Sequence, residues 1–122
     1  MQPTENRNSG GQSPNPRGPS PLLSPALGAH VSVAGGFVEG VRRGTGLACD
    51  ALQIFVKSPS QWQSKPLPPE DAAAFRAAHA ESAIGPVVAH AAYLINLAAP
   101  DAQVLARSRT ALADELRRCA AL

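Results

Sequence analysis

The sequence lacks a strong net charge, has few aromatic residues and contains only two cysteines. Its formal net charge is +2 over 122 residues, whereas nucleic-acid binders often have a strongly basic balance. Any nucleic-acid binding is therefore expected from a local site. Cys49 and Cys119 follow no metal-ligand spacing, so both are interpreted as ordinary small thiols. Nothing indicates an oxidising compartment, and the expected localisation is cytoplasmic.

Long apolar runs are missing from the start of the chain. Residues 1–26 are rich in Pro, Gly, Ser and Asn, and their only apolar run is the pair Leu22-Leu23. This composition argues against a secretory signal and predicts a disordered tail, because it buries too little surface to offset the entropy of ordering. The folded part is expected to be residues 27–122, one modest domain.

One uncharged stretch is long enough to cross a bilayer. Residues 82–100 carry no formal charge, but Gly85, Pro86, His90 and Pro100 interrupt them. We therefore interpret the stretch as a strand followed by a loop, and not as a membrane span.

Short apolar runs and helical patterns alternate in the folded part. Strands are expected at 27–33, 51–57 and 83–90, and helices at 37–50, 69–82 and 100–122. This βαβαβα order predicts an α/β fold with a parallel sheet. It fits either part of a (β/α)8 barrel or half of a doubly wound sheet. No Gly-x-Gly-x-x-Gly motif follows the first strand, which counts against a dinucleotide fold. Three βα units without a fourth strand would make about three eighths of a barrel.

Helical periodicity predicts which side chains face inward. In the first helix, Phe37 or Val38 shares the inward face with Val41 and Leu47. Gly40 and Gly44 each cost about 1 kcal/mol of helix stability. His79, in the second helix, is expected to face solvent. The three phenylalanines are expected in the core: Phe37, Phe55 and Phe75. The last helix should bury one apolar stripe and expose its arginines; the stripe is Val104 or Leu105, Ser108, Leu112, Leu116 and Cys119.

Each expected strand ends on a side chain that carries nitrogen. These residues are His30, Lys57 and His90. Function in α/β folds gathers at the carboxyl ends of parallel strands, so the two histidines are expected to converge on one mouth. A single histidine at such a position is more often a hydrogen-bonded core residue than a ligand. Trp62 and Tyr93 follow the second and third strands, where an aromatic ring can cover the rim or stack on a nucleic-acid base.

Four segments together resemble a known family. They are GAHVSVAGG, QIFVKSPSQW, HAAYLINLAAPD and SRTALADELRRC, in this order, and the resemblance covers about residues 27–122. They closely resemble the amino-terminal part of endonuclease IV, the zinc-dependent apurinic/apyrimidinic endonuclease of base excision repair. The resemblance implies a (β/α)8 barrel, monomeric in its full-length form, that binds three zinc ions. It also implies hydrolysis of the phosphodiester 5′ to an abasic site in double-stranded DNA.

The resemblance also assigns residues. His90 matches a zinc ligand, and His30 matches a histidine near the site that is not a direct ligand. Tyr93 and Leu94 match the loop that enters the minor groove at the lesion. Two further residues match a neighbouring DNA-contacting loop: Gln61 and Trp62.

The sequence departs from the family pattern in several places. Ser58 and Ser60 stand where asparagine and a stacking arginine are common, and Ala99 stands where Ser or Thr would cap the last helix. The family's remaining zinc ligands lie beyond Leu122, and one histidine cannot hold a zinc cluster. The chain is therefore expected to be an amino-terminal fragment. Two alternatives stay open: a fragment without catalytic activity, and a fragment of a sugar-isomerase-like barrel.

Overall fold

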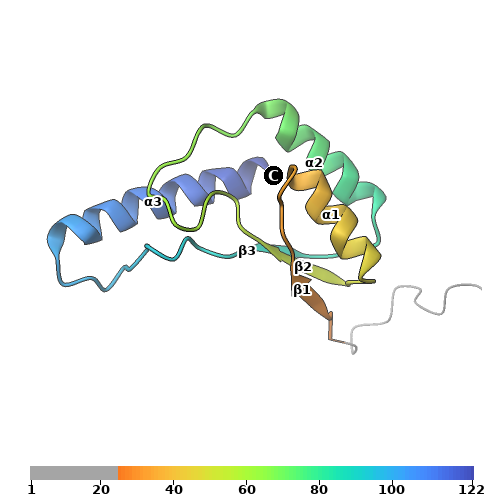
Figure 1. Cartoon of the computed structure of the whole chain (residues 1–122), viewed down its shortest axis with the longest axis horizontal. Helices are drawn as coiled ribbons and strands as arrows, with labels where there is room; N and C mark the ends of the chain where they lie inside the picture. Colours follow the sequence, from red (N-terminus) through yellow and green to blue (C-terminus); the bar gives the residue numbers. More distant parts are fainter. Residues whose placement is uncertain (1–24) are drawn as a thin grey trace, which may run out of the picture.

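The computed structural model describes residues 25–122, so the predicted tail lies outside the described residues except for its last two positions. In chain order the elements are β1 (Gly28–His30), α1 (Phe37–Gly46), β2 (Ala51–Ile54), α2 (Pro69–Glu81), β3 (Val87–Ala89) and α3 (Ala102–Ala121). The predicted βαβαβα order is confirmed (Figure 1). Each strand is shorter than expected, because only three or four residues of each apolar run lie within the hydrogen-bonded sheet.

The strands form one parallel sheet in the order β1-β2-β3. Residues paired across it form two rows, Ala29–Leu52–Val87 and His30–Gln53–Val88. Successive side chains of a strand point to opposite faces. The first row packs into the core beneath the helices, so the second row faces away from them. This strand order occurs both in a (β/α)8 barrel and in half of a doubly wound sheet.

The apolar core lies between the sheet and the pair α1 and α2. Its buried members are Val31, Val41, Leu52, Ile54, Val56, Phe75 and Ile84. Gly44 of α1 faces Leu52 so closely that a Cβ at position 44 would lie 2.4 Å from Leu52 Cδ2. The glycine therefore allows close packing of helix on sheet. The prediction for Leu47 is wrong: its side chain is 65% exposed, because α1 ends at Gly46.

The prediction that His79 faces solvent is also wrong. Its Nε2 lies 3.1 Å from the Ile84 carbonyl oxygen and 2.8 Å from that of Gly85. Its ring stacks on Phe75 with centroids 5.8 Å apart. Since carbonyl oxygens only accept hydrogen bonds, Nε2 carries a proton and donates to both. His79 thus fixes the turn between α2 and β3.

The last helix begins and packs differently from the prediction. Asp101 is the N-cap: its Oδ1 accepts from the backbone nitrogens of Gln103 at 2.8 Å and Val104 at 2.9 Å. The missing cap inferred from Ala99 is therefore supplied two residues later. The residues that α3 buries are Ser108, Ala111, Glu115 and Arg118. Leu116, predicted inward, is 61% exposed, and Cys119 is exposed as well.

Polar side chains of α3 face inward because this helix packs mainly against the loop after β2 and the loop after β3. The loops present backbone N–H and C=O groups, which require hydrogen-bond partners when buried. In Figure 1, α3 extends past the ends of the strands, and its carboxyl end returns beside α2, where the Arg76 guanidinium donates to the Ala121 carbonyl.

The uncharged stretch 82–100 holds β3 between two irregular segments. No helix within residues 25–122 combines the length and apolar character that a bilayer crossing requires. Both cysteines are free thiols. Partial burial raises the pKa of the Cys119 thiol, and the nearby Glu115 carboxylate raises it further, so the thiol form is favoured at neutral pH.

Candidate functional site

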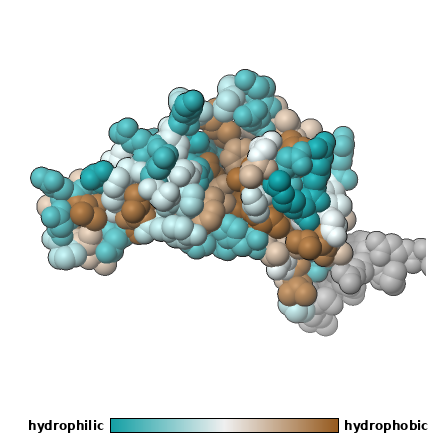
Figure 2. All heavy atoms as spheres, in the orientation of Figure 1, coloured by the Kyte–Doolittle hydropathy of each residue, from teal (hydrophilic) through white to brown (hydrophobic). Residues whose placement is uncertain are grey.

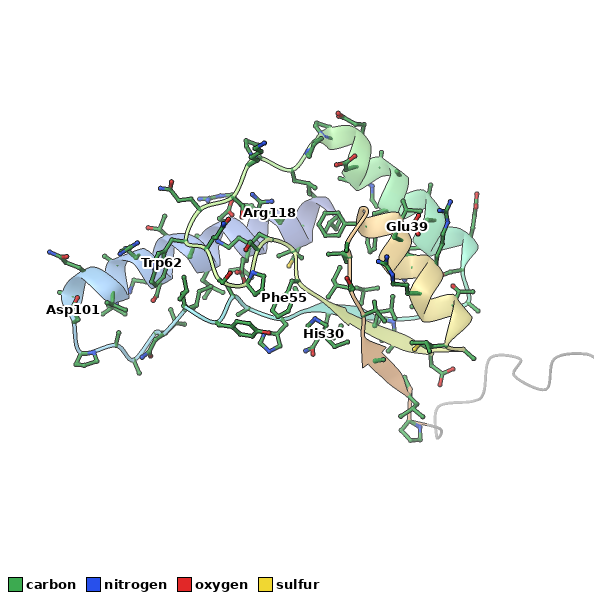
Figure 3. The ribbon with its side chains drawn as sticks, viewed as in Figure 1. His30, Glu39, Phe55, Trp62, Asp101 and Arg118 are labelled. Carbon is green, nitrogen blue, oxygen red and sulfur yellow. The ribbon has the colours of Figure 1, made fainter. Side chains whose placement is uncertain are left out.

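Four rings gather at the carboxyl ends of the strands, on the face away from α1 and α2. The His30 ring lies 4.6 Å from Phe55 and 5.7 Å from His90, measured between centroids. Phe55 lies 5.0 Å from His90 and 5.3 Å from Tyr93. His90 and Tyr93 are 5.8 Å apart, edge to face. The prediction that both histidines converge on one mouth is therefore confirmed; Figure 3 shows His30 and Phe55 close together.

Phe55 is a member of this cluster that the sequence reasoning placed in the core. Its neighbours Ile54 and Val56 are buried core residues, whereas Phe55 packs between the two imidazoles on the opposite side. The alternation of strand side chains could have indicated this, because the residue between two core-facing neighbours points to the other face.

The hydrogen bonds of both histidines use Nδ1, and within residues 25–122 neither Nε2 has a hydrogen-bond partner. His90 Nδ1 lies 2.7 Å from the Ala91 carbonyl oxygen. An oxygen that only accepts requires a proton on Nδ1, so Nε2 keeps its lone pair. His30 Nδ1 lies 3.1 Å from Gln53 Oε1 in the same way. A histidine that binds a metal usually has this arrangement, with its second nitrogen donating to a carbonyl.

The described residues do not complete a metal site. Within residues 25–122, no group of three or more His, Cys, Asp or Glu side chains is placed to hold a metal ion. A catalytic zinc ion needs about three protein ligands. His90 is thus suited to act as one ligand, but the residues present do not fit a whole zinc centre.

Lys57 lines a pocket together with His30 and Phe55, but its ammonium group is bound on the side of α3. Its side chain is 1% exposed, with Nζ 3.7 Å from Asp114 Oδ2 on α3 and 3.1 Å from the Trp62 carbonyl oxygen. Arg118 Nε donates to the same Asp114 oxygen at 2.9 Å, and its Nη2 donates to the Lys65 carbonyl at 2.6 Å. Lys57 and Arg118 therefore hold the loop after β2 against α3.

The loop after β3 is held from two sides. The Tyr93 nitrogen donates to the Pro59 carbonyl at 2.8 Å. Two side chains of α3 accept from the same loop: Glu115 Oε1 from Ala92 N and Ser108 Oγ from Asn96 N, each at 3.0 Å. These contacts leave the Tyr93 side chain 68% exposed, beside a half-buried Leu94.

A groove lies between the loop after β2 and the first turns of α3. Its volume is about 690 Å³, and it is lined by Ser60, Gln61, Trp62, Gln63, Ala106, Arg107, Thr110 and Ala111. The Arg107 guanidinium carbon lies 4.6 Å from the centroid of the Trp62 ring. The structure thus brings Ser60, Gln61 and Trp62 together with Arg107, which sequence reasoning had only placed on an outer helix face. Figure 3 shows Trp62 beside α3, between Asp101 and Arg118.

Sequential parallel strands with polar groups at their carboxyl ends define the class as an α/β fold whose site lies at the carboxyl edge of the sheet. The chain belongs to the xylose isomerase-like TIM barrel family, whose model matches residues 44–122. The structure is therefore a partial (β/α)8 barrel, and half of a doubly wound sheet is excluded.

Curated relatives and a solved structure confirm the resemblance to endonuclease IV. A probable endonuclease 4 of Halorhodospira halophila is 50% identical over 95 residues, covering 78% of this chain and 32% of that protein. One from Chloroflexus aurantiacus is 48% identical over 98 residues, covering 80% and 34%. The crystal structure of endonuclease IV from Thermus thermophilus matches with a TM-score of 0.76 and 41% identity, covering 80% of this chain and 37% of that one. The chain spans about a third of the length of the curated relatives that it matches.

Proposed function

We propose that this chain forms the first three βα units of a zinc-dependent apurinic/apyrimidinic endonuclease. Such an enzyme acts in base excision repair and hydrolyses the DNA phosphodiester 5′ to an abasic site. The observation that carries the proposal is His90 at the carboxyl end of β3, with Nε2 available and the exposed Tyr93 beside it. The names of the relatives, endonuclease 4 and endonuclease IV, support it.

His90 is proposed as one zinc ligand, with His30 beside it near the site. Bound zinc would supply a hydroxide nucleophile at neutral pH and positive charge for the developing oxyanions. The protein's own part is to orient His90: the Ala91 carbonyl holds the Nδ1 proton, and Phe55 packs against the ring. Because residues 25–122 hold no three-ligand group, further ligands have to come from other strands of a complete barrel.

The DNA contacts are proposed to come from the two anchored loops. Tyr93 is exposed enough to enter the gap that a missing base leaves in a duplex, with Leu94 beside it. Ser60, Gln61 and Trp62 would contact the DNA next to the lesion. Ser60 carries no guanidinium, so stacking at this position depends on the neighbouring tryptophan. Lys57 contributes indirectly, by holding the backbone of Trp62.

We also propose a cytoplasmic location and a monomeric complete barrel. The alternative, a fragment of a sugar-isomerase-like barrel, shares the fold that the family description names. The aromatic side chains around the mouth favour DNA, because bases and abasic gaps offer surfaces on which aromatic rings stack.

A duplex with one abasic site tests the proposal directly. We expect the purified chain to retard this duplex in a gel more strongly than the intact one, and Tyr93→Ala to remove that preference. With added zinc the chain is expected not to cut the abasic duplex, because residues 25–122 do not form a complete metal site.

Failure to bind either duplex would remove the support for DNA contacts by this chain and leave the sugar-isomerase-like alternative ahead. Cleavage that His90→Ala abolishes would show that the chain does assemble an active centre.

A further inference from the structure

The groove between the loop after β2 and α3 is lined by one positively charged side chain and no negatively charged one. Its polar lining consists of neutral amides and hydroxyls together with one cation, Arg107, and it includes no carboxylate. The structure gives Arg107 no hydrogen bond or ion pair within residues 25–122; its contact is the face of the Trp62 ring. Stacking occupies the flat face of a guanidinium and leaves the N–H groups at its edge free to bind an oxyanion in bidentate fashion.

Trp62, on whose ring the Arg107 guanidinium packs, is itself held in place. The buried Lys57 ammonium donates to the Trp62 carbonyl oxygen at 3.1 Å, and Asp114 of α3 lies 3.7 Å from the same ammonium. Arg107 lies two turns before Asp114 on α3. Loop and helix are thus joined at one end of the groove, which places the guanidinium before any ligand arrives and reduces the entropy lost on binding.

The loop after β2, which forms one side of the groove, is hydrogen-bonded to the loop after β3 that carries Tyr93. Pro59 accepts a hydrogen bond from the Tyr93 nitrogen at 2.8 Å, and the groove lining begins at the next residue, Ser60. A duplex whose lesion lies at Tyr93 would therefore pass its flanking backbone close to the groove. Phosphate oxygens are bound by arginine, by hydroxyls and by side-chain amides, which are the groups that line it.

We propose that this groove binds a backbone phosphate of the DNA strand flanking the lesion, with Arg107 as the cation and Gln63 and Thr110 as neutral donors. The inference rests on the proposed function and extends it: it adds a contact on α3 that does not depend on base sequence or on the lesion itself. Lesion preference and backbone affinity would thus come from different residues, Tyr93 for the first and Arg107 for the second.

Salt-dependent binding of the chain to labelled DNA tests this separation. Two fluorescein-labelled duplexes serve as probes, one with a tetrahydrofuran abasic analogue and the other intact. Arg107→Gln is expected to weaken binding of both about tenfold at low salt and to reduce the slope of log K against log salt concentration by about 0.9, the value for one lost phosphate contact. Arg109→Gln is the matched control, because Arg109 is also exposed on α3 but does not line the groove.

Equal slopes for Arg107→Gln and Arg109→Gln would overturn the groove inference and leave the proposed function standing, provided that the unmodified chain binds the abasic duplex. An effect of Arg107→Gln on the abasic duplex alone would also overturn it, since a backbone contact acts on both probes. Absence of binding to either duplex by the unmodified chain would contradict both proposals.

Discussion

At the scale of single residues, the two buried glycines of α1 weaken the helix but allow it to pack closely on the sheet. Read from the sequence, Gly40 and Gly44 only weaken a helix. In the structure both are buried against the sheet, and a Cβ at Gly44 would meet the side chain of Leu52. Leu52 is 2% exposed, so it has little room to move. The loss of helix propensity is therefore offset by closer contact between α1 and β2.

Gly44→Ala and Gly46→Ala are expected to change stability in opposite directions. The first introduces a methyl group into a filled core, which costs about 1–3 kcal/mol and outweighs the gain in helix propensity. At Gly46 nothing lies within 4 Å of the added Cβ, so the second gains up to about 1 kcal/mol. Urea denaturation measures both, and stabilisation by both substitutions would contradict the packing argument.

The sequence predicts the order of elements and the meeting of the two histidines, because apolar runs and strand ends are local patterns. It does not predict partners that come from elsewhere in the chain. His79 looked exposed because its acceptors, the carbonyls of Ile84 and Gly85, follow the end of its helix. Phe55 was assigned to the core because apolar character alone does not say which face of the sheet a residue occupies.

At the scale of elements, α3 acts as the support for both loops of the candidate site. Ser108 and Glu115 accept from the loop after β3, while Asp114 and Arg118 hold the loop after β2. Periodicity predicted the helix and, within its inward stripe, the buried Ser108. It was wrong for Leu116 and Cys119, which are exposed, because it looks for apolar residues and the buried face is partly polar. Only the positions of the loop backbones explain why a glutamate is buried.

Glu115→Ala is expected to destabilise the chain by about 1–3 kcal/mol, because the Ala92 N–H loses its acceptor in a buried position. Hydrogen exchange at the Ala92 amide should become faster than in the unmodified chain. Glu115→Gln retains an acceptor oxygen and should have a smaller effect, and Glu81→Ala, at an exposed position, should have almost none. Unchanged exchange at Ala92 in Glu115→Ala would refute the proposed support.

At the scale of the whole molecule, β3 forms one edge of the described sheet. Val88, in the row that faces away from the helices, is 52% exposed, and the space-filling view shows further apolar atoms at the surface around the start of α3 (Figure 2). An open strand edge with exposed apolar side chains favours pairing with another chain. The complete barrel of the family closes this edge with its own strands.

The chain is therefore expected to self-associate as its concentration rises, as measured by sedimentation velocity. Val88→Lys should shift the distribution toward monomer, because a lysine on an edge strand opposes pairing. Leu116→Lys adds the same charge at a position on α3 that is 61% exposed and should have less effect. Monomeric behaviour of the unmodified chain at all concentrations would refute the expectation.

The anchoring of both loops on α3 has a consequence for how such barrels diversify. The hydrogen bonds that shape the two loops run among residues 54–118. The two loops can therefore keep their shape as one structural unit, residues 54–118, even when the sequence of the later strands of the barrel changes. A hybrid that joins these units to the later strands of a different barrel would be expected to keep the first protein's preference for its target, with His90 as the one proposed metal ligand that these units contribute.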